Sequence, residues 1–173
     1  MYNLAPMGKR YVYRQYKELF AKRFYEEKIR IESLIKDSIF IEHVGSTSIP
    51  GMGGKGIIDI LVAVSNKREI PKMSSQLIDA GYYFGPDDGT IERWFHGRKV
   101  SDSKRYHLHL TFEGSKDWKE MIAFRDYLKT HPEDFKRYME VKKRAVKEAS
   151  QDKDIYMRIK EPLIKEIIQK AIT

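Results

Sequence analysis

Residues 56–64, GIIDILVAV, are aliphatic at almost every position, and only Asp59 interrupts the run. A strand that is apolar on successive residues has no polar face to give to water, so it must be covered on both sides. The run therefore predicts a sheet placed between two layers of other elements. It also predicts that Asp59 has a specific partner, since an unpaired carboxylate in apolar surroundings is strongly destabilising.

The spacing of apolar residues elsewhere predicts the remaining elements. Recurrence every three or four positions predicts helices over Val12–Lys36, Pro71–Ala80, Asp117–Lys129, Pro132–Ala149 and Asp154–Ile172. Shorter apolar or alternating runs predict strands over Ile39–Val44, Gly56–Val64, Tyr82–Gly85, Ile91–His96 and Arg105–Phe112. A polar loop, GRKVSDSK, is expected between the last two strands, and Asp117 is expected to cap the helix after them.

The order of these elements predicts the fold class. Strands gather before residue 113 and helices dominate after it. We therefore expect a single α+β domain over residues 1–173, with a small mixed β-sheet flanked by helices and a helical C-terminal half.

Composition limits the compartment and the chemistry. The chain has no cysteine, which excludes disulfides and thiolate metal sites. The first twenty residues lack the apolar core of a signal peptide, and no apolar run approaches the roughly 18 residues needed to span a bilayer. We therefore expect a cytoplasmic protein with no membrane partner.

The net charge of +8 is spread along the chain. Residues 116–173 carry 15 basic and 11 acidic side chains, and there is no basic tail or dense basic stripe. Such an excess attracts anionic ligands without selecting one, so both a solvated surface and a nucleic-acid-binding face remain open.

Five of the eleven glycines lie in residues 45–56, directly before the apolar run. A turn at Gly45 can direct several backbone N–H groups at one point, and Gly51, Gly53 and Gly54 would let a ligand approach the backbone. Lys55 adds a cation. Hydroxyl groups after the turn add further donors: Ser46, Thr47 and Ser48. This composition predicts a phosphate site.

Asp59 follows this loop within the next predicted strand, where an unpaired carboxylate in apolar surroundings is costly. A divalent metal carried by a nucleotide would satisfy its charge within the apolar strand. The alternative is an ordinary glycine-rich turn that leads into a core strand. The loop matches neither the P-loop nor the dinucleotide-binding pattern, which excludes the commonest kinase and NTPase mechanism.

The segment RYHLHLTF places two imidazoles on one face of a strand. With a period of two, His107 and His109 share a face with Arg105, while the leucines point the other way. Such a group can bind a metal, bind a phosphate or transfer protons, and it is also compatible with an exposed hairpin face. Arg125, in FRDYLKTHPEDFKRY, either pairs with neighbouring acids or points into a cleft at an anion.

Taken together, these blocks resemble the GrpB family: HVGSTSIPGMGGKGIIDILVAV, RYHLHLTF, FRDYLKTHPEDFKRY and the Tyr156–Lys160 pair keep order and spacing over roughly Ile41–Lys165. The resemblance implies the nucleotidyltransferase superfamily and its DNA polymerase beta-like fold. Gly45 and Ser46 then match the turn that seats nucleotide phosphates. Asp59 matches the first carboxylate of a metal-binding pair.

The chain departs from the superfamily pattern at Leu61, which stands where the second metal-binding carboxylate is expected. Two-metal transfer needs bridging carboxylates, and one aspartate does not supply them. His107 and His109 are therefore the expected additional ligands of a single site, for magnesium, manganese or zinc. Asp59 and Lys55 are the expected catalytic residues.

The sequence thus favours a nucleotidyltransferase-like protein that binds a nucleotide or phosphorylated small molecule with a divalent metal. The predicted phosphate contacts are Gly45, Ser46, Thr47, Ser48, Lys55, Arg105 and Arg125. One alternative is a binding module without transfer activity, favoured by Leu61. The other is a nucleic-acid-binding protein, favoured by the net charge.

Overall fold

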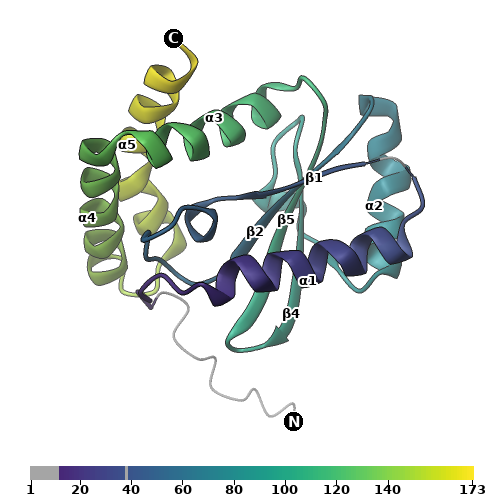
Figure 1. Cartoon of the computed structure of the whole chain (residues 1–173), viewed down its shortest axis with the longest axis horizontal. Coiled ribbons are helices and arrows are strands. Elements are labelled where there is room, and N and C mark those ends of the chain that lie inside the picture. Colours follow the sequence, from purple (N-terminus) through teal and green to yellow (C-terminus); the bar gives the residue numbers. More distant parts are fainter. Residues whose placement is uncertain (1–11, 38) are drawn as a thin grey trace.

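The computed structural model describes residues 12–37 and 39–173, and within them the chain folds around a five-stranded mixed sheet of order β1-β2-β5-β4-β3 (Figure 1). Its central strands β2 and β5 are parallel, and the other neighbouring pairs are antiparallel. The strands are β1 Phe40–Val44, β2 Ile58–Val64, β3 Tyr83–Phe84, β4 Trp94–Ser101 and β5 Lys104–Phe112. The segment 1–11, part of the stretch interpreted as lacking a signal peptide, lies outside the described residues.

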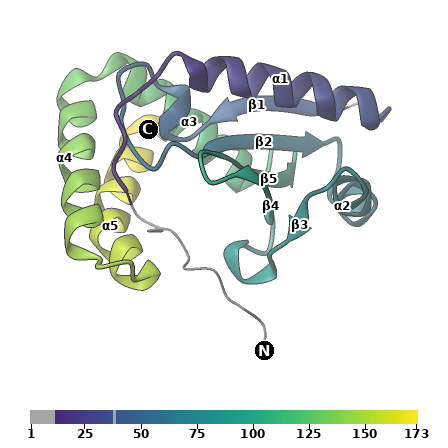
Figure 2. The same cartoon turned by 90° about the horizontal axis from the view of Figure 1, so that it is seen from below.

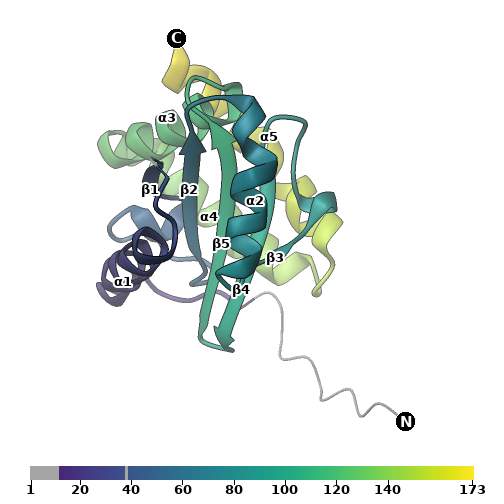
Figure 3. The ribbon, with the colours of Figure 1, turned by 90° about the vertical axis from the view of Figure 1, so that its right-hand side faces the viewer.

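Helices cover both faces of this sheet, as the apolar run in β2 predicts. They are α1 Leu19–Leu34, α2 Ile70–Asp79, α3 Lys116–Thr130, α4 Pro132–Glu148 and α5 Lys153–Ile172. Figures 2 and 3 show α1 and α2 on one side of the strands, and Figure 1 shows α3, α4 and α5 gathered at the other end of the molecule. The predicted α+β fold with a helical C-terminal half is confirmed.

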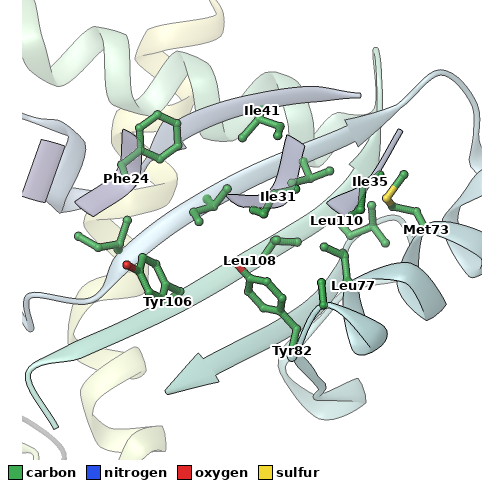
Figure 4. Packing of buried hydrophobic residues seen from close by; sticks show 14 of the residues in the cluster. Phe24, Ile31, Ile35, Ile41, Met73, Leu77, Tyr82, Tyr106, Leu108 and Leu110 are labelled. Atoms are coloured by element: carbon green, nitrogen blue, oxygen red, sulfur yellow. The ribbon is translucent and has the colours of Figure 1, made fainter. Parts of the chain in front are cut away.

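The core between the sheet and the first two helices stabilises β2 and β5. Even-numbered residues of both strands, such as Ile60 and Leu108, pack against Phe24 and Ile31 of α1 and Leu77 of α2 (Figure 4). Burying each such side chain contributes roughly 1.5–3 kcal/mol. The odd-numbered residues of the same strands, which include Asp59 and both histidines, therefore face α3, α4 and α5.

A second apolar cluster fixes the glycine-rich loop to the C-terminal helices. Ile49 and Met52 of the loop are fully buried. Their partners come from α3, α4 and α5: Leu128, Tyr138, Leu163 and Ile167. The loop is therefore enclosed between the sheet and the helices, and its geometry depends on both.

The first helix begins at Leu19, and the prediction of a helix from Val12 is wrong for its first seven residues. Arg14 instead pairs with Gly54, with N–H···O distances of 2.6 and 2.9 Å in the two directions. The segment that contains Arg14 thus lies along the glycine-rich loop. A long-range backbone pairing of this kind overrides the local helical spacing.

Two other local predictions are corrected. Residues 97–101 continue β4, so the expected polar loop is reduced to a tight turn at Asp102 and Ser103. Ser115, and not Asp117, caps α3, because the Ser115 hydroxyl accepts a hydrogen bond from the N–H of Trp118 at 3.1 Å. Polar side chains on an exposed hairpin resemble a loop in sequence, which explains the first error.

No helix within the described part of the chain combines the length and the apolarity that crossing a membrane requires.

Candidate functional site

The parallel pairing of β2 and β5 brings Asp59 and the two histidines together. Asp59 lies opposite His107 and Leu61 lies opposite His109, so their side chains share one face. The Asp59 Oδ1 atom is 3.2 Å from His109 Nε2 and 3.8 Å from His107 Nδ1. The predicted association of these three side chains is therefore present in the structure.

Arg93, which precedes β4, completes a chain of polar contacts behind His109. Its Nη1 lies 2.9 Å from His109 Nδ1, and its Nε donates to Asp117 Oδ1 at 2.9 Å. Because a guanidinium has donors and no acceptor, His109 Nδ1 must be the acceptor of this hydrogen bond. The proton of the neutral imidazole then sits on Nε2, which donates to Asp59.

The ionisation of Asp59 and His107 follows from these surroundings. Burial on its own would raise the pKa of Asp59, but the hydrogen bond from His109 and the nearby basic groups, Lys55 among them, lower it to about 2. Burial lowers the pKa of His107 to about 4, against the attraction of Asp59. At neutral pH the site therefore holds a carboxylate beside a neutral His107.

The turn at Gly45 seats this carboxylate. Gly45 has φ of +68°, and a Cβ atom built on it would lie 2.5 Å from Asp59 Oδ2. Only glycine avoids both the backbone strain and the overlap. The backbone of Gly45 therefore packs directly against the Asp59 carboxylate, so the Gly-Ser turn and Asp59 lie side by side as the sequence predicts.

The later glycines of the loop serve the protein itself. A side chain at Gly53 would overlap Tyr13 and the Arg14 carbonyl group, and one at Gly54 would overlap Lys142 Nζ and Ser46 Oγ. The expectation that these glycines admit a ligand to the backbone is therefore wrong. They admit the N-terminal segment and a lysine of α4.

Three lysines reach the same region from three different elements. Lys142 of α4 is only 3% exposed and donates to the Gly53 carbonyl oxygen at 2.6 Å. Lys160 of α5 lies with Nζ 4.3 Å from the centre of the Tyr156 ring, and Lys55 Nζ lies 5.2 Å from the centre of the same ring. Both ammonium groups thus lie over the same aromatic ring.

Burial and mutual repulsion make two of these ammonium groups costly. Burial and the charge of Lys160 lower the pKa of Lys142 well below its usual value. Burial and the charge of Lys55 lower the pKa of Lys160 to about 8. Throughout residues 12–37 and 39–173, no carboxylate forms an ion pair with Lys142 or Lys160. Asp59 attracts both ammonium groups from a longer distance, so Lys142 and Lys160 form a cationic group with no carboxylate of these residues in direct contact.

A cleft of about 630 Å³ opens between this face of the sheet and the C-terminal helices. Asp59 and the lysines line it together with apolar side chains that include Met121 and Phe124 of α3 and Ile164 of α5. The arrangement offers an anion-binding end, a carboxylate and an apolar wall within one cavity.

Comparison with known proteins identifies the family. The model of the family described as GrpB protein matches residues 12–170. The chain belongs to the GrpB family. A crystal structure of conserved protein GrpB from Enterococcus faecalis has the same fold, with a TM-score of 0.81 at 27% identity, covering 93% of this chain and 97% of that one.

Curated relatives support this membership. The chain is 31% identical to the UPF0157 protein YqkA of Bacillus subtilis over 157 residues. This alignment covers 90% of this chain and 46% of that protein. Over 158 residues it is 29% identical to the glutamate-rich protein GrpB of Alkalihalophilus pseudofirmus, covering 88% and 91%. The GrpB chain thus spans less than half the length of the Bacillus relative. GrpB membership fixes its fold and assigns it no specific activity.

Six of the residues predicted from sequence line the cleft of this GrpB chain: Gly45, Ser46, Lys55, Asp59, His107 and His109. Four others do not. Thr47 is buried, donates to the Ile57 carbonyl group at 3.3 Å and bonds to His43. Ser48 donates to the Gly45 carbonyl group at 2.6 Å. Both hydroxyls therefore stabilise the turn.

The two predicted arginines also lie elsewhere. Arg125 donates to Glu42 at 2.5 Å, to the His43 carbonyl group at 2.9 Å and to Asp126 at 2.8 Å, so it ties α3 to β1. Arg105 lies opposite Lys99 near the hairpin turn, outside the cleft lining. The alternative in which Arg125 pairs with neighbouring acids is the one that the structure shows.

Sequence reasoning did not assign Lys142, Lys160 or Arg93 to the site. For the lysines a signal exists, since each stands on the buried stripe of its helix. The buried residues of these stripes are Tyr138, Lys142 and Ala145 in α4, and Tyr156, Leu163 and Ile167 in α5, where the half-buried Lys160 stands between Tyr156 and Leu163. A lysine on a buried stripe indicates a special partner. Arg93 has no such signal, because it lies in a turn.

The donor set does not fit the predicted metal. Among the described residues, no three histidine, aspartate or glutamate side chains are placed to hold one metal ion. His109 has both ring nitrogens engaged, with Arg93 donating to Nδ1 and Nε2 donating to Asp59. A metal ligand needs a free lone pair, which this tautomer does not offer toward Asp59.

Proposed function

We propose that the cleft of this GrpB chain binds a nucleotide or another phosphorylated small molecule. The phosphate would sit among Lys142, Lys160 and Lys55, next to Ser46. The observation that carries the proposal is that Lys142, which is buried, and Lys160, which is half-buried, line one cleft and form no ion pair with a carboxylate in the described part of the chain.

Electrostatics explains why such lysines indicate an anionic ligand. Removing an ammonium group from water is costly, and proteins normally offset the cost with a paired acid. Here Lys142 has one carbonyl acceptor and Lys160 has an aromatic ring. A phosphate ester carries two negative charges near neutral pH and supplies the missing acceptors for several ammonium groups at once.

The remainder of the cleft fits the organic part of such a ligand. Its volume of about 630 Å³ is in the usual range for a small-molecule site. Met121, Phe124 and Ile164 provide apolar surface for a ring system, while Asp59 provides an acceptor for hydroxyl or amino groups. The resemblance to nucleotidyltransferases favours a nucleotide among these ligands.

Transfer of a nucleotidyl group is not part of the proposal. Leu61, the position of the second carboxylate in the superfamily pattern, is fully buried in β2 on the same face as Asp59. Without that carboxylate, a pair of bridged metal ions has no second anchor. The proposal is therefore restricted to binding.

Ligand binding should raise the thermal stability of the protein. We expect the melting temperature to rise with millimolar pyrophosphate or with ATP, GTP, CTP or UTP, since a ligand that binds only the folded state stabilises it. Calorimetry on the wild type and on Lys142→Met and Lys160→Met should show the affinity falling by roughly tenfold or more in each variant, because charged hydrogen bonds contribute about 1.5–3 kcal/mol.

The matched control is Lys165→Met, which removes an exposed lysine paired with Glu161 on the same helix. It should bind the same probes with unchanged affinity. Absence of binding by every probe, or equal affinity in wild type and both cleft variants, would contradict the proposal. RNA or DNA binding that falls steeply with salt and ignores all three substitutions would instead support the nucleic-acid alternative.

A further inference from the structure

Hydrogen bonds from both its backbone and its side chain hold Arg93 in place. Asp117, in the first turn of α3, accepts from Arg93 Nε at 2.9 Å and from the Thr90 hydroxyl at 2.8 Å. The same hydroxyl accepts from the backbone N–H groups of Arg93 and Glu92 at 3.0 and 3.2 Å. The turn before β4 and the start of α3 thus fix the direction of the guanidinium.

This fixed guanidinium determines the hydrogen-bond role of His109. An N–H of Arg93 points at Nδ1 over 2.9 Å, so a proton on Nδ1 would face another proton. The neutral form with hydrogen on Nε2 is the one that satisfies both neighbours. Asp59 Oδ1, 3.2 Å away, then receives a permanent donor.

The two oxygen atoms of the Asp59 carboxylate therefore have different surroundings. Oδ1 is occupied by His109, whereas Oδ2 faces the turn at Gly45 and Ser46, which lines the cleft. The hydrogen bond from His109 ends on Oδ1 and leaves Oδ2 on the side of the turn. This second oxygen is therefore the one that a molecule in the cleft would meet.

We propose that Arg93 is a positioning residue that fixes His109 as an Nε2–H donor and makes Asp59 a hydrogen-bond acceptor for the ligand instead of a metal ligand. The ligand part of this inference rests on the proposed function. It narrows the ligand class to phosphorylated molecules with a hydroxyl or amino group that can reach Asp59 while the phosphate lies at the lysines.

The tautomer of His109 tests this directly in the ligand-free protein. Long-range ¹H–¹⁵N NMR distinguishes protonated from unprotonated ring nitrogens, and His109→Gln assigns the signals. In the wild type near neutral pH we expect hydrogen on Nε2 only. In Arg93→Met we expect this single tautomer to be lost. Arg105→Met, which removes an arginine outside the cleft, should keep it.

Metal binding provides the second readout. Mn²⁺ titrations followed by electron paramagnetic resonance should give the same affinity, within about twofold, for wild type and Asp59→Asn. Removing a true metal ligand or its supporting partner instead lowers affinity by roughly tenfold or more.

Three results would overturn the proposal: hydrogen on Nδ1 of His109 in the wild type, an unchanged tautomer in Arg93→Met, or a tenfold loss of Mn²⁺ affinity in Asp59→Asn. The wild-type spectrum alone is decisive if Arg93→Met does not fold. No phosphorylated ligand is present in these experiments, so a failure of the proposed function would leave their outcome unaffected.

Discussion

Lys160→Met is expected to raise the free energy of unfolding by roughly 2–3 kcal/mol at neutral pH in the absence of ligand. Burial and the charge of Lys55 lower the pKa of Lys160 from 10.5 to about 8. Each unit by which a lysine pKa is lowered corresponds to about 1.4 kcal/mol of destabilisation of the charged form. Methionine removes the charge and keeps an unbranched side chain against the ring of Tyr156, where its sulfur is well accommodated.

The pH dependence identifies the cause of this effect. Between pH of about 8 and 10.5 the unfolded chain binds a proton at Lys160 that the folded chain has released, so the stability of the wild type rises with pH. Lys160→Met lacks this contribution. The stability difference between the two proteins should therefore be largest below about pH 8 and shrink toward pH 10.5.

Urea unfolding at a series of pH values measures this difference. Lys165→Met serves as the control, because its lysine is exposed and paired with Glu161, and its stability should stay within about 0.5 kcal/mol of the wild type at each pH. A Lys160→Met protein that is less stable than the wild type, or a difference independent of pH, would show that Lys160 is not destabilising. A stabilised variant with weakened ligand binding would mean that the lysine is retained for the ligand.

The meeting of Asp59 with the histidines could be predicted partly from strand geometry and partly from the resemblance to the GrpB family. A period of two places His107 and His109 on one face, and a parallel neighbour then sets Asp59 beside them. The layered α+β fold follows equally from the apolar run in β2. Local periodicity gives the face on which each side chain lies, whereas the pairing of β2 with β5 is a long-range contact that periodicity does not determine.

The cationic end of the site could not be predicted in the same way. Lys142 and Lys160 belong to helices about a hundred residues away from Asp59, and their convergence depends on how α4 and α5 pack against the loop. The choice between Arg125 and Arg93 has a similar origin. Both are arginines near acids, and only the tertiary structure shows which one contacts Glu42 and which one contacts His109.

Gly45→Ala is expected to lower the free energy of unfolding by roughly 3–4 kcal/mol. About 1–3 kcal/mol arises from placing a side chain at φ of +68° and ψ of −172°, a backbone region that is essentially restricted to glycine. The remainder arises from the new Cβ atom, which would lie 2.5 Å from Asp59 Oδ2 and force the carboxylate away from His109. Breaking that hydrogen bond to a charged group accounts for about 1.5–3 kcal/mol.

Gly114→Ala separates these two causes. Gly114 has φ of +80°, and a Cβ atom there would meet nothing within 4 Å, so this variant carries the backbone strain alone. Its stability should fall by only about 1–2 kcal/mol. Chemical unfolding of both variants, followed by circular dichroism, gives the overlap with Asp59 as the difference.

A double-mutant cycle with Asp59→Ala tests whether position 45 requires glycine because of the turn alone or because of the contact with Asp59. Asp59→Ala removes the carboxylate that the new Cβ atom would meet, so Gly45→Ala should cost only about 1–3 kcal/mol in that background, the strain of its own backbone conformation. The coupling energy is then roughly 2 kcal/mol, since residues in contact do not behave additively. A coupling near zero would mean that Gly45 is required by the turn alone. A coupling of the expected size would mean that the glycine is required because the Gly-Ser turn and Asp59 form one closely packed unit at the mouth of the cleft.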